Sequence, residues 1–118
     1  EMCIRDREDF EKAGCRVILC TDDGSAGFRG LVTEPLRKVL EEPKDVVLAC
    51  GPGPMLKGVA EEAEARGVPC QISLEERMGC GVGACLVCAC KIKKADGEEA
   101  YLHVCKDGPV FNAEEVVF

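Results

Sequence analysis

The chain has 118 residues, 47% of them hydrophobic and 31% charged, which is ordinary for one folded globular domain or two very small ones. Its formal net charge of −7 argues against binding to the phosphate backbone of nucleic acid. No apolar run approaches the roughly 18 residues of a membrane helix, and no leader resembles a signal peptide. We therefore expect a cytoplasmic protein with no nucleic acid and no membrane as partners.

The first 77 residues alternate between helical and strand-like patterns. Helices are expected over residues 6–13, 33–42 and 54–66, where apolar side chains recur at helical spacing. Short and almost continuously apolar runs predict buried strands over residues 15–20, 45–50 and 68–76. Strand, helix and strand in immediate succession are typical of right-handed crossovers onto a parallel sheet. The chain starts at Glu1, in the approach to a helix, so we expect an N-terminal part to be missing.

The pattern changes after Arg77. A loop rich in glycine and cysteine is followed by strands expected around 88–93 and 101–105, with a turn at Asp96-Gly97 between them. These features predict a small β-rich lobe. The predicted fold class is α/β, with a partial parallel-sheet domain over residues 1–77 and the β-rich lobe over 78–118.

The ten cysteines form two groups. A disulfide-rich secreted scaffold explains neither group well, because such scaffolds are usually short and poor in amphipathic helices. Five cysteines crowd into the last third of the chain. The other five stand singly in apolar surroundings, where a cysteine is usually a small buried side chain: Cys3, Cys15, Cys20, Cys50 and Cys70.

The clustered cysteines have the spacing of an iron-sulfur site. Four residues separate Cys80 from Cys85 and two separate Cys85 from Cys88, as in plant-type [2Fe-2S] ferredoxins, which take a fourth thiolate from farther along the chain. A structural zinc site or disulfides are the alternatives, although zinc sites favour two short cysteine pairs and only one is seen here. Three glycines would let the loop wrap a cluster and point backbone N–H groups at sulfur: Gly79, Gly81 and Gly83.

Two cysteines compete for the role of fourth ligand. Cys105 is favoured, because the hairpin that starts at Cys88 would return the chain to the same edge. Cys90 shares a strand face with Cys88, so it could pack beside a cluster without binding it. For His103, the only histidine, a surface or packing role is expected.

A second candidate site lies where two predicted parallel strands end. The stretches "TDDGSAG" and "CGPGP" begin at the carboxyl ends of such strands, outside which open α/β sheets bind ligands. The amides of Gly51 and Gly53 precede a helix and could face a phosphate. Neither stretch is a dinucleotide fingerprint or a P-loop, so tight turns are the alternative. Asp22 and Asp23 could bond ribose hydroxyls or form turn-stabilising Asx bonds.

Four segments in this order resemble a known family: "TDDGSAGFRGLVTE", "ACGPGPML", "SLEERMGCGVGACLVCACKIK" and "HVCKDGPVFNAEEVV". They are similar to the C-terminal part of the electron-transfer subunits of dihydroorotate dehydrogenase B, which are ferredoxin-reductase-like flavoproteins. The resemblance implies a ferredoxin-reductase-like NAD-binding domain followed by a [2Fe-2S] lobe. It implies cluster ligands at Cys80, Cys85, Cys88 and Cys105. It also implies a nicotinamide dinucleotide crevice lined by Thr21, Asp22, Asp23, Gly24, Ser25, Cys50, Gly51 and Pro52.

In that family NADH reduces FAD, and electrons then pass singly through the [2Fe-2S] cluster to FMN in a separate dihydroorotate dehydrogenase catalytic subunit. The resemblance therefore implies a role in pyrimidine biosynthesis, with NADH and that FMN-containing subunit as partners in a heterotetramer. The family's N-terminal flavin barrel and first strand-turn-helix have no counterpart in these 118 residues. FAD is thus expected only in the full-length protein, and this non-catalytic electron-transfer piece is expected to be inactive alone.

Two other functions remain open from the sequence. The chain could belong to a related NAD(P)H:ferredoxin or sulfide oxidoreductase, whose NADH-side residues would look similar. It could also be a zinc-stabilised binding module with no redox role.

Overall fold

The computed structural model describes residues 2–94 and 96–118, with side chains from Asp6 onward. The chain divides into two compact units, Glu1–Val39 and Leu40–Phe118, which are described separately below. Within the described residues, no helix is both long and apolar enough to cross a membrane.

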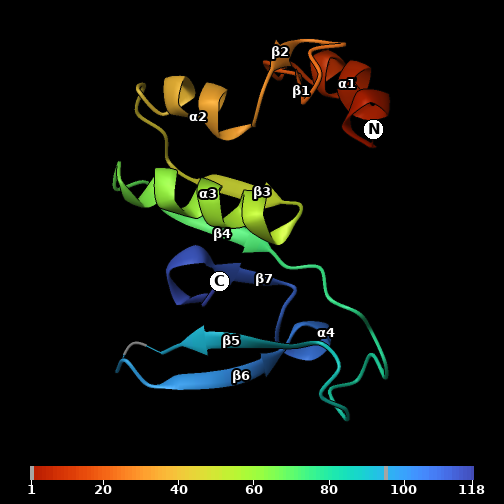
Figure 1. Cartoon of the computed structure of the whole chain (residues 1–118), viewed down its shortest axis with the longest axis vertical. Helices are drawn as coiled ribbons and strands as arrows, with labels where there is room; N and C mark the ends of the chain where they lie inside the picture. Colours follow the sequence, from red (N-terminus) through yellow and green to blue (C-terminus); the bar gives the residue numbers. More distant parts are fainter. Residues whose placement is uncertain (1, 95) are drawn as a thin grey trace. The chain divides into compact units, whose positions relative to one another are not determined.

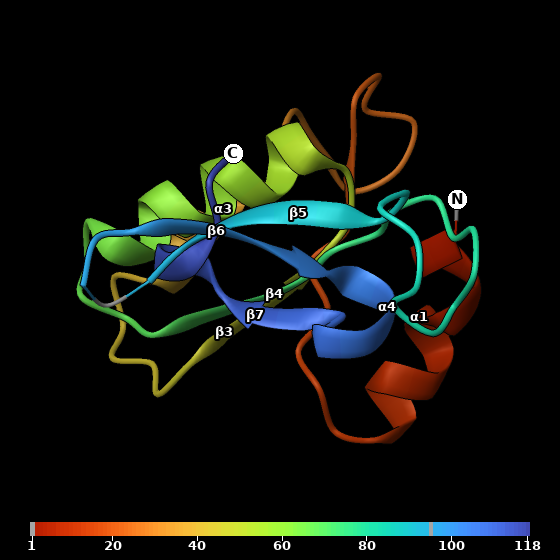
Figure 2. The same ribbon diagram turned by 90° about the horizontal axis from the view of Figure 1, so that it is seen from below.

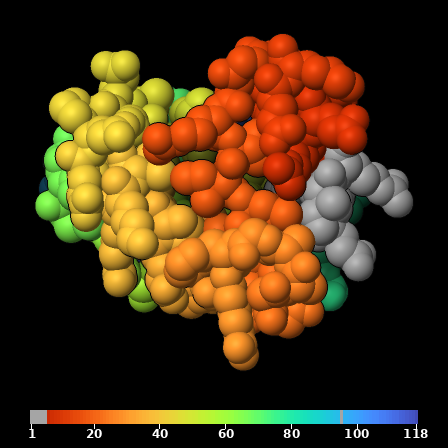
Figure 3. Space-filling model, turned by 90° about the horizontal axis from the view of Figure 1, so that it is seen from above, coloured from red at the N-terminus to blue at the C-terminus, as the bar shows by residue number. Residues whose placement is uncertain are grey.

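The first unit contains two helices and one pair of very short strands (Figure 1). The strands pair in parallel, Cys20 with Phe28 and Thr21 with Arg29. The atoms of residues 6–39 of this unit form the red-to-orange part of the surface in Figure 3. Its elements are α1 (Met2–Lys12), β1 (Cys20–Thr21), β2 (Phe28–Arg29) and α2 (Thr33–Val39).

The predicted strand over 15–20 is wrong for most of its length. Only its last residue, Cys20, is in a strand, and β1 pairs with β2 rather than with a strand of the larger sheet. The Phe28 N–H donates to the Leu19 carbonyl at 2.7 Å, so the chain folds back locally onto its own strand. No described element covers the run before it, and Ile18 is 47% exposed.

The helix predicted over 33–42 ends three residues early, at Val39. Pro43 sets a limit just beyond this end, because it has no N–H to donate to the Val39 carbonyl and it disfavours the helical conformation of Glu42. The helix could therefore not continue through Glu42 as predicted.

The second unit is built on a three-stranded sheet with the order β3-β4-β7. β3 and β4 pair in parallel, as predicted, whereas β7 pairs antiparallel to β4 and was not predicted. The buried side of α3 is formed by Leu56, Val59 and Ala63, and Figure 1 shows the helix lying across β3 and β4. The elements are β3 (Val47–Cys50), α3 (Gly53–Glu64), β4 (Cys70–Ser73) and β7 (Val110–Asn112).

A hairpin and a short helix complete the second unit. β5 (Ala89–Lys93) and β6 (Glu99–His103) are antiparallel, and α4 (Val104–Asp107) follows directly. The predicted strand over 101–105 is wrong at its end, because Cys105 lies in α4. The His103 N–H donates to the Asp107 carboxylate at 2.8 Å, which closes this helical turn. A 3-10 helix, η1 (Ala113–Glu115), follows β7.

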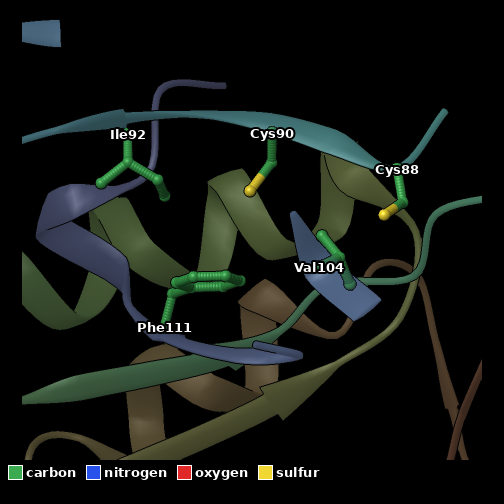
Figure 4. Close-up of a cluster of buried hydrophobic side chains, with 5 residues drawn as sticks. All are labelled: Cys88, Cys90, Ile92, Val104 and Phe111. Atoms are coloured by element: carbon green, nitrogen blue, oxygen red, sulfur yellow. The ribbon is translucent and has the colours of Figure 1, made fainter. Parts of the chain in front are cut away.

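The apolar interior of the second unit has two neighbouring clusters. One lies between α3 and β4 and includes Leu56 and Ile72. Leu74 and Val116 pack against both clusters, so the hairpin and the helix–sheet layer share one interior. Figure 4 shows the other cluster, in which Cys90 and Ile92 on β5 point toward Val104 and Phe111. The members of this cluster are Cys88, Cys90, Ile92, Val104 and Phe111.

The expectation that the scattered cysteines are buried is wrong in part. Cys15 and Cys50 are exposed, Cys20 and Cys70 are half-buried, and the side chain of Cys3 lies outside the described residues. Cys50 is exposed because β3 has one uncovered face, on which Leu48 is 71% exposed. The division into residues 1–77 and 78–118 concerns the extent of the two domains and stays a prediction.

Candidate metal centre

Four cysteines meet where the loop between β4 and β5 approaches α4. Cys80 and Cys85 come from the loop, Cys88 lies just before β5, and Cys105 belongs to α4. Figures 1 and 2 both place this loop and α4 at the same end of the β5–β6 hairpin. The antiparallel register explains this, since Ala89 at the start of β5 is paired with His103 at the end of β6.

The Cys80 thiol is surrounded by backbone donors. Its sulfur accepts hydrogen bonds from the Val82 N–H at 3.4 Å and the Ala84 N–H at 3.2 Å. The N–H groups of Val82, Cys85 and Ala84, together with the Cys85 thiol, lower the pKa of Cys80 to about 6. Such a concave set of amides is a recurrent way of stabilising an anion or a metal-bound sulfur.

Glycines allow the loop to make this concave arrangement. Gly81 and Gly83 have φ values of 70° and 77°, which side chains other than glycine's rarely adopt. A Cβ atom at Gly79 would lie 3.1 Å from the Cys85 sulfur. The predicted positive φ is found at Gly81 and Gly83 but not at Gly79.

Cys88 and Cys105 form a second pair of thiols. Cys88 is fully buried and Cys105 half-buried. The pKa of Cys105 is raised chiefly by its hydrogen bond with the Cys88 thiol, while the Gly83 N–H acts in the opposite direction. The Val104 N–H also donates to the Cys88 carbonyl at 3.1 Å, which ties the start of α4 to the start of β5.

Cys90 and His103 have other contacts. The Cys90 thiol donates to the Leu102 carbonyl at 3.5 Å inside the apolar cluster of Figure 4, and burial raises its pKa. His103 lies at the N-terminal end of α4, with its Nδ1 3.7 Å from an Asp107 carboxylate oxygen. Both residues thus have structural roles, as the sequence suggested for His103.

Sequence reasoning missed Lys106. Its side chain lies against Gly83, since a Cβ atom added at that glycine would be 2.7 Å from the Lys106 Cδ. The only feature of the sequence that could have pointed to Lys106 is its position directly after Cys105.

The site brings soft sulfur donors together in two contacting pairs, Cys80 with Cys85 and Cys88 with Cys105. Thiolates of this kind suit zinc or iron-sulfur clusters. Across residues 2–94 and 96–118, no three His, Cys, Asp or Glu side chains are grouped as ligands of one metal ion. No disulfide links the cysteines whose side chains are described.

The residues of the predicted dinucleotide crevice fall in both units. In the first unit, the Asp23 carboxylate accepts the Ser25 N–H at 2.9 Å, which is the Asx turn considered as an alternative. The Thr21 hydroxyl donates to the Ala26 carbonyl at 2.9 Å. In the second unit, Cys50–Pro52 lead into α3, and a Cβ at Gly51 would meet the Met55 methyl at 2.4 Å. The crevice itself stays a prediction.

Comparison with known proteins assigns the metal chemistry. Residues 75–117 match the family described as the iron-sulfur cluster binding domain of dihydroorotate dehydrogenase B. A solved structure of an NADH-dependent reduced ferredoxin-NADP oxidoreductase superposes with a TM-score of 0.75 at 34% identity, over 93% of this chain and 38% of that one. The family match and the cysteine loop thus define an iron-sulfur protein.

Three relatives narrow the assignment. The electron transfer subunit of dihydroorotate dehydrogenase B from Caldanaerobacter subterraneus subsp. tengcongensis is 51% identical over 94% of this chain and 44% of its own length. That from Bacillus caldolyticus is 53% identical over 93% and 40%. A probable one from Methanocaldococcus jannaschii is 43% identical over 100% and 42%. The chain belongs to this family, as predicted, and spans less than half the length of these relatives.

Proposed function

We propose that this chain carries electrons, one at a time, through a [2Fe-2S] cluster held by Cys80, Cys85, Cys88 and Cys105. The observation that carries the proposal is the arrangement of these thiols in two contacting pairs around a loop whose amides point at sulfur. A two-iron cluster needs two protein thiolates on each iron, which four cysteines in two pairs supply. When bound, the cluster would accept and release single electrons.

The residues of the chain have separate tasks in this proposal. The four thiolates hold the irons, and the amides of Val82 and Ala84 donate to the Cys80 sulfur. Hydrogen bonds to cluster sulfurs favour the more negative, reduced state and so raise the reduction potential. The apolar cluster that includes Cys88 and Val104 fixes one side of the site. Cys90 takes no part in binding iron.

We further propose that the electrons come from NADH through FAD in a longer form of the protein and pass to the FMN of a dihydroorotate dehydrogenase catalytic subunit. This would place the chain in cytoplasmic pyrimidine biosynthesis. The relatives that support it are named as electron transfer subunits of dihydroorotate dehydrogenase B. In the longer form, Thr21–Ser25 and Cys50–Pro52 would line the dinucleotide crevice.

The test is iron and acid-labile sulfide analysis of anaerobically purified protein, with an EPR spectrum after dithionite reduction. We expect two irons and two sulfides per chain and a signal from a spin of one half in the reduced state. Zinc without labile sulfide, in protein never exposed to air, would refute the redox proposal and leave a zinc-stabilised module.

A second candidate keeps the cluster and changes the partner. The likeness to the NADH-dependent reduced ferredoxin-NADP oxidoreductase, at 34% identity, favours exchange with ferredoxin. Co-expression with an FMN-containing dihydroorotate dehydrogenase subunit separates the two. Co-purification at equal stoichiometry supports the first candidate, whereas an intact cluster that reduces ferredoxin and does not bind that subunit supports the second.

A further inference from the structure

A lysine lies directly on the cysteine loop. A Cβ atom built at Gly83 would be 2.7 Å from the Cδ and 3.2 Å from the Cβ of Lys106, so the lysine stem runs along the open face of this glycine. The ammonium group is two bonds beyond Cδ, and Lys106 is exposed to solvent. Lys106 itself belongs to α4 and follows Cys105 directly.

The contact with α4 depends on a glycine at position 83. Its φ of 77° is a conformation that residues with a Cβ atom rarely adopt. The stem of Lys106 in α4 occupies the space that a side chain at this position would need.

The charge of Lys106 is not neutralised by a neighbour. Among the described residues, no carboxylate lies within ion-pair distance of its ammonium, whereas Lys91 and Lys44 have such partners in Glu99 and Glu42. In a chain with a net charge of −7, the stem of this cation lies against the cysteine loop.

We propose that Lys106 is a positioning residue of the cluster site, whose stem clamps α4 to the loop at Gly83 and whose charge raises the reduction potential. This inference rests on the function proposed above. Reduction adds one electron, and hence one negative charge, to the site without making or breaking a bond to the protein. A nearby cation stabilises that added charge and so favours the reduced state.

The experiment is a dithionite titration of the complete chain with bound cluster, in which EPR intensity reports the fraction reduced. Lys106→Met keeps an apolar stem and removes the charge, so we expect a lower midpoint potential. The expected change is up to about tenfold in the ratio of reduced to oxidised protein at a fixed potential, or ~59 mV for one electron. Lys106→Arg should keep the parent potential.

Lys94→Met is the matched control. It removes the same charge from an exposed residue just beyond the far end of β5, six residues from Cys88. At roughly 3.3 Å per residue this is more than a Debye length of about 10 Å, so salt screens its effect. Equal shifts in Lys106→Met and Lys94→Met would overturn the proposal, because they would report net charge alone. An unshifted Lys106→Met would also overturn it.

The results of this titration distinguish a failure of the proposed role of Lys106 from a failure of the proposed function of the chain. A parent chain without iron and sulfide would refute both. A parent with its cluster and an unshifted Lys106→Met would refute only the role of Lys106. If Lys106→Met assembles no cluster, Lys106→Gln is titrated in its place. If neither of these variants assembles a cluster and Lys106→Arg does, the result would support the part of the proposal in which the Lys106 side chain positions α4 against the loop.

Discussion

Two glycine-containing loops of this chain use their backbone N–H groups differently. In the loop after β1, the N–H groups of Ser25 and Ala26 donate to oxygens of Asp23 and Thr21 a few residues away. In the loop before β5, the N–H groups of Val82 and Ala84 donate to a sulfur. In the first loop, these backbone N–H groups are hydrogen-bonded to nearby side-chain oxygens. In the second, they donate to a side chain that can bind metal.

The comparison shows that glycine content does not by itself mark a binding loop. Both loops contain glycines with positive φ, including Gly24 at 75° and Gly83 at 77°. They differ in the acceptor to which the backbone donors are turned and in the second element that meets the loop. Here α4, which carries Cys105, meets the cysteine loop where the Lys106 stem lies against Gly83.

Replacing a sulfur acceptor should produce the largest effect. We expect Cys80→Ser to lower bound iron by more than half and the reduced EPR signal by roughly tenfold, because a serine hydroxyl stays protonated at neutral pH and binds iron more weakly than a thiolate. Iron analysis and EPR at equal protein concentration measure this. Cys88→Ser should behave in the same way, since it removes one member of the other pair.

Cys90→Ala is the matched control for these variants. It removes a buried thiol from the same strand region and should keep full iron while losing about 1 kcal/mol of unfolding free energy through the small cavity left behind. Loss of iron in Cys90→Ala with normal iron in Cys105→Ser would show that the ligand set has been assigned wrongly.

Alanine at a loop glycine should give the next largest effect, and the two loops should respond unequally. At Gly27 (φ 69°) a Cβ would lie 2.1 Å from the Leu19 carbonyl oxygen. At Gly81 (φ 70°) nothing lies within 4 Å of the same atom. We expect Gly27→Ala to cost about 3 kcal/mol, from backbone strain and steric clash together, and Gly81→Ala about 1 kcal/mol from strain alone.

Hydrogen exchange of the amides in each loop measures these costs locally. Gly14→Ala, at φ 84° with nothing within 4 Å, is the control within the first unit and should resemble Gly81→Ala. If Gly27→Ala and Gly14→Ala lose similar stability, the backbone at Leu19 must move aside at little energetic cost. The predicted difference between crowded and open glycines would then be wrong.

The sequence predicted best those elements that are stabilised by local patterns. The predicted bounds of the helix over 54–66 agree with those of α3 to within two residues, because its apolar face and the glycine that ends it, Gly67, are local signals in the sequence. The strand over 15–20 failed because a strand also needs a partner, which an apolar run does not specify. The strand β7 was missed for the converse reason, since its three residues depend on pairing with β4 for their conformation.

The cysteine loop was predictable because metal ligation fixes spacing in the sequence itself. Four residues between Cys80 and Cys85 and two between Cys85 and Cys88 can be read without a structure. The helical conformation of Cys105 could not be predicted from spacing, because it depends on the hydrogen bond from the His103 N–H to the Asp107 carboxylate. The contact between Gly83 and Lys106 joins residues distant in sequence and leaves no pattern.

The smallest expected effect is at Asp23, one of the two carboxylates of the first loop. The Ser25 N–H and hydroxyl hold the pKa of this exposed carboxyl below its ordinary value. Because the folded pKa is lowered, the stabilisation is fully present above the unfolded value of about 3.9 and is lost as pH falls through the folded pKa. NMR titration of the carboxyl carbon should give a midpoint below about 3.9.

Asp23→Asn keeps the side-chain oxygen acceptor and removes the charge, so it isolates this contribution. In urea unfolding, the parent should exceed Asp23→Asn in stability slightly at pH 5, and the difference should shrink by pH 3. Iron content should not change. A larger difference at pH 3 than at pH 5 would contradict the assignment. The small size follows from exposure: an amide that stabilises a carboxylate in water competes with solvent, whereas the amides around Cys80 act together on one sulfur.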